Sequence, residues 1–211
     1  MATASTMTLS SATKLLDTFL QSVLSQLGFQ RIQPLAYVRP SGEADAVLSF
    51  PCRLDPRGPC CFTCHVGVRF DSLEALLRSG PSDKTRSTVM MPLHLLRENK
   101  SFTEWQFYAS EDLERLRETV TRELTVIALP FIERFSKLPE LRGRLESSTP
   151  SDWFVLGPEQ RLNVLAVVQF VQGDKSGALK TLDDALLERK GALPAKRLPI
   201  EAVRKRLAGA A

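Results

Sequence analysis

The residues best suited to chemistry are concentrated in one short stretch of the 211-residue chain, CRLDPRGPCCFTCH, at positions 52–65. This stretch contains all four cysteines of the chain and one of its two histidines. Thiolates and imidazoles are the usual ligands of structural zinc, and two neighbouring thiols can also form a disulfide or a redox pair. The stretch is therefore compatible with a metal site, with thiol redox chemistry, or with a buried strand that has no chemistry at all.

The spacing of the cysteines favours the strand. Cys61 and Cys64 are separated by Phe and Thr, which are typical of strands, whereas zinc ligands with this spacing usually flank a turn. Side chains alternate between the two faces of a strand, so the two sulfur atoms would point in opposite directions and could not share a metal ion. We therefore predict a strand over residues 60–70, no metal and no cofactor. The face predicted to be buried carries Cys60, Phe62, Cys64, Val66, Val68 and Phe70.

Thiol redox chemistry and histidine catalysis stay open as alternatives. A thioredoxin-like motif needs its Cys-x-x-Cys at the start of a helix, where the dipole lowers the thiol pKa, and no helix is predicted here. A disulfide would join Cys52 to Cys60 or to Cys64, across the hairpin that DPRGP closes. Neither His65 nor His94 has a nucleophile or a second histidine motif beside it.

The sequence also lacks the local signatures of the common enzyme classes. It has no glycine-rich phosphate loop, no G-x-S-x-G and no H-E-x-x-H. We accordingly predict no catalytic residue and a protein that is not an enzyme. Catalytic carboxylates need no local signature, and an uncharacterised enzyme is therefore kept as an alternative.

The formal charge of +4 is distributed unevenly along the chain. Residues 189–206 contain seven Lys or Arg and one Glu, so this segment carries a local charge of +6. Such a segment can steer association with an acidic protein or bind nucleic acid, although no aromatic residue is interleaved to stack on bases. It can also be a solvated helix end. The residues predicted to contact a partner are Lys196, Arg197, Arg204, Lys205 and Arg206.

Targeting signals are missing from the sequence. No run approaches the roughly 18 apolar residues of a membrane-spanning helix, and the first 29 residues lack the three regions of a secretory signal. We therefore expect a cytoplasmic protein with no membrane partner. The apolar residues near the N-terminus instead recur at helical spacing and predict an amphipathic helix over residues 11–27, capped by Ser10 or Ser11.

The remaining patterns predict an α+β fold with an N-terminal helix, an antiparallel sheet of about four to six strands, a long kinked helix and a C-terminal helical hairpin. An apolar stripe begins at Ser110 and continues past Pro130, which should kink that helix near residues 126–129. Residues 137–157 are expected to be irregular. The other predicted elements are strands at 32–39, 44–54 and 60–70, a helix at 71–79, extended segments at 89–96 and 102–109, and helices at 158–172, 178–190 and 200–208. We expect an α+β domain over residues 1–141, with a helical extension over 142–211 packed on it as one compact unit.

Three stretches together resemble a known family: LGFQR (27–31), EWQFYASEDLERL (104–116) and LTVIALPFIERFSKLPEL (124–141). The chain is similar over residues 12–141 to a small bacterial α+β family catalogued as a domain of unknown function. In that family an opening helix precedes a sheet, and a long helix carries Pro-Phe near its end.

The resemblance implies a function but no catalytic residues. Proteins of this kind are often found beside secreted bacterial toxins, where they act as immunity proteins. The expectation is a bacterial immunity protein that binds a cognate toxin, such as a type VI secretion effector, and occludes its active site. The alternatives are a nucleic-acid-associated accessory protein that uses the basic segment, or an uncharacterised enzyme.

Overall fold

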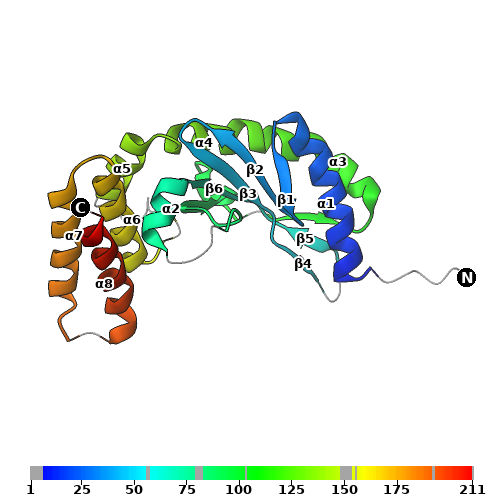
Figure 1. Cartoon of the computed structure of the whole chain (residues 1–211). Coiled ribbons are helices and arrows are strands. Elements are labelled where there is room, and N and C mark those ends of the chain that lie inside the picture. Colours follow the sequence, from blue (N-terminus) through cyan, green and yellow to red (C-terminus); the bar gives the residue numbers. More distant parts are fainter. Residues whose placement is uncertain are drawn as a thin grey trace, which may run out of the picture.

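The computed structural model describes residues 7–55, 58–78, 83–102, 104–147, 154, 156–191 and 193–210. All of its strands lie before residue 108, among a few helices, and the rest of the described chain is helical (Figure 1). In chain order, the elements are α1 (Leu9–Gln26), β1 (Gln30–Gln33), β2 (Ala36–Ser41), β3 (Ala44–Ser49), β4 (Cys52–Leu54), β5 (Cys60–Phe62), β6 (His65–Arg69), α2 (Asp71–Leu77), β7 (Val89–Pro92), the 3-10 helix η1 (Leu93–Leu96), β8 (Trp105–Phe107), α3 (Ser110–Glu123), the π-helical turn η2 (Leu124–Ala128), α4 (Leu129–Phe135), α5 (Leu138–Glu146), α6 (Pro158–Val171), α7 (Lys175–Glu188) and α8 (Pro194–Gly209).

The strands form two antiparallel sheets, and the predicted α+β class is confirmed. The larger sheet has the order β1-β2-β3-β6-β7, and the smaller one has the order β4-β5-β8. The chain passes from the larger sheet to the smaller between β3 and β4 and returns between β5 and β6. Pro92 lies in β7, an edge strand, where its missing N–H costs no ladder hydrogen bond.

Each of the three long strands predicted between residues 32 and 70 is in fact two strands. The first turns back at Leu35, which has a left-handed φ of 59°, and forms the hairpin β1–β2. The second is interrupted at Pro51, whose carbonyl accepts from the N–H of Thr63 at 3.1 Å. The third is interrupted at Cys64, whose carbonyl accepts from Leu93 N–H at 2.8 Å. The interruptions at Pro51 and Cys64 carry the chain from one sheet to the other.

The cysteines lie where the two sheets meet, and all four are free thiols. Cys60 and Cys64 belong to the main hydrophobic core, whereas Cys61 is buried outside it. Cys61 lies in β5 and Cys64 in the connection to β6, so the two residues do not share one strand as predicted. The core face also holds the other predicted residues Phe62, Val66, Val68 and Phe70.

Helix α1 packs its apolar stripe against β1, β4 and α3. Its N-cap is Thr8, two residues before the predicted Ser10, because Thr8 Oγ1 accepts from the N–H of Ser11 at 3.2 Å. The stripe carries one buried carboxylate, Asp17, which accepts a hydrogen bond from the hydroxyl of Tyr37 at 2.7 Å. This bond joins the helix to β2 of the larger sheet.

The long helix runs along the sheet from α1 toward α5 and α6 (Figure 1). It consists of α3, the π turn η2 and α4, so the predicted irregularity before Pro130 is present as a π turn at residues 124–128. The prediction of an irregular segment at 137–157 was wrong in its first half. Helix α5 occupies Leu138–Glu146. Its Pro139 is compatible with the helix because it lies in the first turn, where a missing N–H is harmless. Residues 148–153 and 155 of that segment lie outside the described residues.

Three helices close the chain, and the predicted hairpin is confirmed as α6 and α7. The last helix, α8, is longer than predicted and begins at Pro194. Helices α6 and α8 both contact α2. Arg206 of α8 donates hydrogen bonds to the carbonyls of Leu76 and Leu77 at the end of α2, at 2.7 and 2.6 Å.

Candidate functional site

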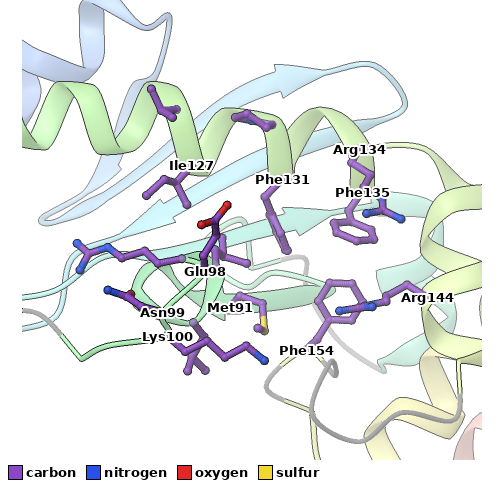
Figure 2. A pocket seen from close by; sticks show the side chains of 15 residues that line it. Met91, Glu98, Asn99, Lys100, Ile127, Phe131, Arg134, Phe135, Arg144 and Phe154 are labelled. Carbon is purple, nitrogen blue, oxygen red and sulfur yellow. The ribbon is translucent and has the colours of Figure 1, made fainter.

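A groove of about 850 Å³ lies between the long kinked helix and the segment that follows β7. Its size is within the range of ordinary ligand and peptide sites. Figure 2 shows Phe131 and Phe154 projecting into the groove from opposite sides, with the charged ends of Lys100 and Arg144 beside them. The lining residues are Met91, Leu95, Leu96, Arg97, Glu98, Asn99, Lys100, Val126, Ile127, Pro130, Phe131, Arg134, Phe135, Arg144 and Phe154.

The floor of the groove is a cluster of three aromatic rings. The ring centroids of Phe131 and Phe135 are 4.9 Å apart, and Phe154 lies 6.0 Å from the first and 5.1 Å from the second. Tilted and edge-on ring contacts at these distances are favourable and fix the orientation of each ring. Met91, which is 8% exposed, adds a polarisable side chain at the same depth. The floor is therefore a rigid, preformed apolar surface.

The rim of the groove is predominantly cationic. Among the described residues, four Lys or Arg side chains line it and one carboxylate does, that of Glu98. Arg134 is held over the ring of Phe135, with the guanidinium carbon 5.2 Å from the centroid, and is also 3.2 Å from Glu140. Arg97 pairs with Glu123 of α3 at 2.5 Å. Because its positive side chains outnumber its described carboxylates, the rim favours an anionic group over a cationic one.

The π turn forms the upper wall of the groove. Leu129 N–H donates to the carbonyl of Leu124, five residues earlier, and this wider turn changes the direction in which the following side chains point. Ile127 lines the cavity, and Val126 is 66% exposed at its edge. Single π turns inside α-helices occur frequently at functional sites.

Among the residues that the structure describes, the lining of the groove contains no Ser, Thr, Tyr, Cys or His, and its one carboxylate is that of Glu98. Among the described residues, no three His, Cys, Asp or Glu side chains are grouped as a metal site would need. No described helix is long and apolar enough to cross a membrane.

The thiols and histidines lie outside the groove lining. Burial raises the pKa of Cys60 to about 12 and also raises the pKa of the Cys64 thiol, so both stay protonated and poorly nucleophilic. Burial and the nearby His94 lower the pKa of His65. The ring of His94 stacks edge-on against Phe102 at 5.0 Å.

The five basic residues predicted to contact a partner all lie on α8, and the structure divides them. Arg197 pairs with Glu201 at 3.0 Å, Arg204 pairs with Asp183 of α7, and Arg206 is bonded to carbonyls of α2. Lys196 and Lys205 are exposed, and the described residues provide neither with an ion pair. Of the five predicted residues, Lys196 and Lys205 are therefore the two whose charge no described residue pairs with.

Comparisons with known proteins give no guide to this site. No family model matches the chain, no curated protein is similar to it, and no solved structure matches its fold.

Proposed function

We propose that this chain is an immunity-type binding protein, which acts in the cytoplasm by binding a cognate toxin and covering its active site. The single observation that carries this proposal is the groove, with its rigid floor of three phenylalanines and its cationic rim. The resemblance of residues 12–141 to a family associated with immunity proteins motivates the choice of a toxin as the partner, although no family model matches the chain.

The groove favours a partner segment of defined chemistry. A rigid apolar floor gains the most from one large aliphatic or aromatic side chain that is fully desolvated in it, since interface energy is concentrated in such anchors. Lys100, Arg134 and Arg144 around that floor favour carboxylates beside the anchor. We infer that the toxin presents an acidic surface loop with one apolar anchor.

The exposed lysines of α8 have a separate role in this proposal. Lys196 and Lys205 would steer an acidic partner toward the molecule without entering the interface. Neutralising both should lower the association rate and weaken its dependence on salt, while the dissociation rate stays the same. Unchanged association kinetics would remove the lysines from the proposal but leave the groove in it.

The test begins with capture of the tagged chain from its own cells at moderate salt. We expect one stoichiometric partner that poisons cells when it is expressed alone and is harmless beside this chain. Two groove variants, Val126→Asp and Arg134→Glu, should each weaken capture and protection, since both place an acid against an acidic partner. Both positions are exposed, so these changes are compatible with the fold.

The matched control is Arg115→Glu on the same long helix. The Arg115 side chain is 81% exposed and does not line the groove, so its reversal changes the net charge as much as Arg134→Glu does, and more than Val126→Asp does, without touching the floor or the rim. Loss of protection in the groove variants but not in this control supports the proposal. Equal protection by all three variants would contradict it. Recovery of nucleic acid with a steep salt dependence would instead favour the alternative function.

A further inference from the structure

Two thiols lie beside each other on one face of the smaller sheet. Strands β4 and β5 pair antiparallel, with Cys52 opposite Phe62. Cys60 comes two residues before Phe62 on β5, and side chains two apart on a strand share a face. Cys52 and Cys60 are therefore diagonal neighbours, and both pack on the core side of the sheet. The thiol of Cys52 is also a hydrogen-bond partner of the Cys60 thiol.

The other two cysteines do not share this arrangement. Cys61 is paired with Arg53 in the same hairpin, so its side chain points to the opposite face of the sheet. Cys64 comes after the end of β5, and its thiol donates to the carbonyl of His65 at 3.8 Å. The strand register therefore selects Cys60 rather than Cys64 as the neighbour of Cys52, a choice that the spacing of the cysteines leaves open.

The two thiols of this pair differ in their access to solvent. Cys52 is half-buried, with its Sγ 3.6 Å from the hydroxyl of Thr13 on α1, whereas Cys60 is 0% exposed. A small oxidant from solvent can therefore reach Cys52 and not Cys60. An accessible thiol with a second thiol beside it is the usual arrangement of a redox-responsive pair, in which the first thiol is oxidised and the second one resolves it.

We propose that Cys52 and Cys60 form a reversible disulfide when the chain meets a hydroperoxide. Cys52 Sγ attacks a peroxide oxygen, so an S–O bond forms, the O–O bond breaks, and Cys52 becomes a sulfenic acid while an alcohol or water leaves. Cys60 Sγ then attacks Cys52 Sγ; the S–S bond forms, the S–O bond breaks, and the hydroxide leaves with the Cys60 proton as water. Two thiols and one hydroperoxide thus give one disulfide, one alcohol and one water. This site is independent of the groove and of the function proposed for it.

The surroundings of Cys60 make the second step the slower one. Burial, and then the Cys52 thiol, raise the pKa of Cys60 to about 12, so little thiolate is present. The part that comes from Cys52 disappears once Cys52 is oxidised, and the proximity of the two sulfur atoms makes the step intramolecular.

The diagonal register also makes the bond easy to reverse. Diagonal neighbours are separated by about 7–8 Å, slightly more than the limit of about 6.8 Å between the Cα atoms of a relaxed disulfide. The hairpin must therefore shift for the bond to form, and strained disulfides are readily reduced. A dithiol should restore both thiols, as expected of a disulfide that forms transiently in a reducing compartment.

Peptide mapping of the full chain after treatment with hydrogen peroxide tests this proposal. Trypsin separates Cys52 from the other three cysteines, because Arg53 and Arg57 lie between them. After free thiols are blocked, the monomeric chain should lack the mass of two hydrogen atoms, and the peptide with Cys52 should be linked to the peptide that begins at Gly58. Dithiothreitol should reverse both changes. Unlinked peptides, or links only between separate chains, would overturn the proposal.

Two variants identify the partner of Cys52. Cys60→Ala should lower the yield of linked peptides at least tenfold and leave a sulfenic acid on Cys52 that dimedone labels. The double variant Cys61→Ser with Cys64→Ala retains only the proposed pair and should form the link as the unmodified chain does. This second test does not depend on how Cys60→Ala folds. A link that persists in Cys60→Ala, or that is lost in the double variant, would assign the disulfide to another cysteine and overturn the proposal.

Discussion

The backbone N–H of Leu129 donates to the carbonyl of Leu124, five residues earlier, where a regular α-helix joins residues four apart. Pro130 follows and has no N–H, so the carbonyl of Val126 receives no helical hydrogen bond from it. The same turn places Ile127 in the lining of the groove. The proline and the shape of the binding surface are therefore linked.

Replacing Pro130 with alanine tests this link. Proline is about 3 kcal/mol less favourable than alanine inside a helix, and part of that gain is offset by the greater freedom of the unfolded chain. We expect Pro130→Ala to raise the free energy of unfolding by roughly 1–2 kcal/mol, measured by urea denaturation, and to weaken capture of the partner. A lower free energy of unfolding would show that the proline stabilises the native helix, and unchanged capture would show that it does not shape the binding surface.

Tyr37 and Asp17 provide a second test, in the interior. The Tyr37 hydroxyl donates to Asp17 Oδ1 at 2.7 Å, and the same oxygen accepts from Leu35 N–H at 2.9 Å. Hydrogen bonds to charged groups contribute about 1.5–3 kcal/mol, and we expect Tyr37→Phe to lower the free energy of unfolding by that amount. Tyr108→Phe is the control: that side chain is 65% exposed, so its effect should stay within about 0.5 kcal/mol.

Tyr37 also predicts a loss of stability in alkali. Burial, and then its hydrogen bond to Asp17, raise the pKa of Tyr37 above its ordinary value of 10.0. Below that value both states are protonated and the group contributes no pH dependence. Above it the unfolded chain releases the proton and the folded chain does not, so the free energy of unfolding falls as the pH rises past about 10. The slope should be smaller in Tyr37→Phe, and an unchanged slope would assign it to other groups.

Arg206 offers a test of how the C-terminal helices are attached. Its guanidinium donates to the carbonyls of Leu76 and Leu77, which end α2 without α-helical partners. We expect Arg206→Ala to lower the free energy of unfolding by about 1.5–3 kcal/mol. Lys205→Ala, the neighbouring exposed residue, should change it by less than about 0.5 kcal/mol. Equal effects of the two substitutions would mean that the contact with α2 contributes no measurable stability.

The fold class could be predicted because each element carries its own periodic signal. The apolar stripe of α1 and the stripe from Ser110 through Pro130 depend only on neighbouring turns of one helix. The strands were harder, because a continuous apolar run does not reveal where the chain leaves one sheet for another. That change is made by contacts distant in sequence, such as Leu93 N–H with the Cys64 carbonyl.

The groove could not be predicted, because nothing local marks it. Its floor joins Met91, Phe131 and Phe154, which come from a strand, a helix and a connecting segment. Each of these residues alone looks like an ordinary core side chain. The one usable signal was Pro130, which predicted the kink and so the place where the helix surface opens. The basic segment was visible in the sequence, but not that Arg206 is committed to α2.

The cysteines predict a clear order of chemical modification. Iodoacetamide reacts with thiolates, and burial raises the pKa of Cys60 to about 12 and raises the pKa of Cys64 as well. Cys52 is the only half-exposed cysteine, so it should be alkylated first in the native protein, at least tenfold faster than the other three. Peptide mass mapping over time measures this, and Cys52→Ser should remove the fast phase. Fast labelling of Cys64 would contradict the burial of that residue.

His65 predicts a loss of stability in mild acid. Burial, and then the nearby His94, lower the pKa of His65 below its ordinary value of 6.5. Above pH 6.5 the imidazole is neutral in both states, and its contribution to stability is complete. Below that pH the unfolded chain takes up the proton first, so the free energy of unfolding should fall as the pH decreases from 7 to 5. His65→Gln should flatten this part of the profile, and His94→Gln should flatten it less, since His94 is the smaller of the two causes. Urea denaturation at pH 5, 6, 7 and 8 measures all three chains, and a profile unchanged by His65→Gln would exclude this histidine as the source.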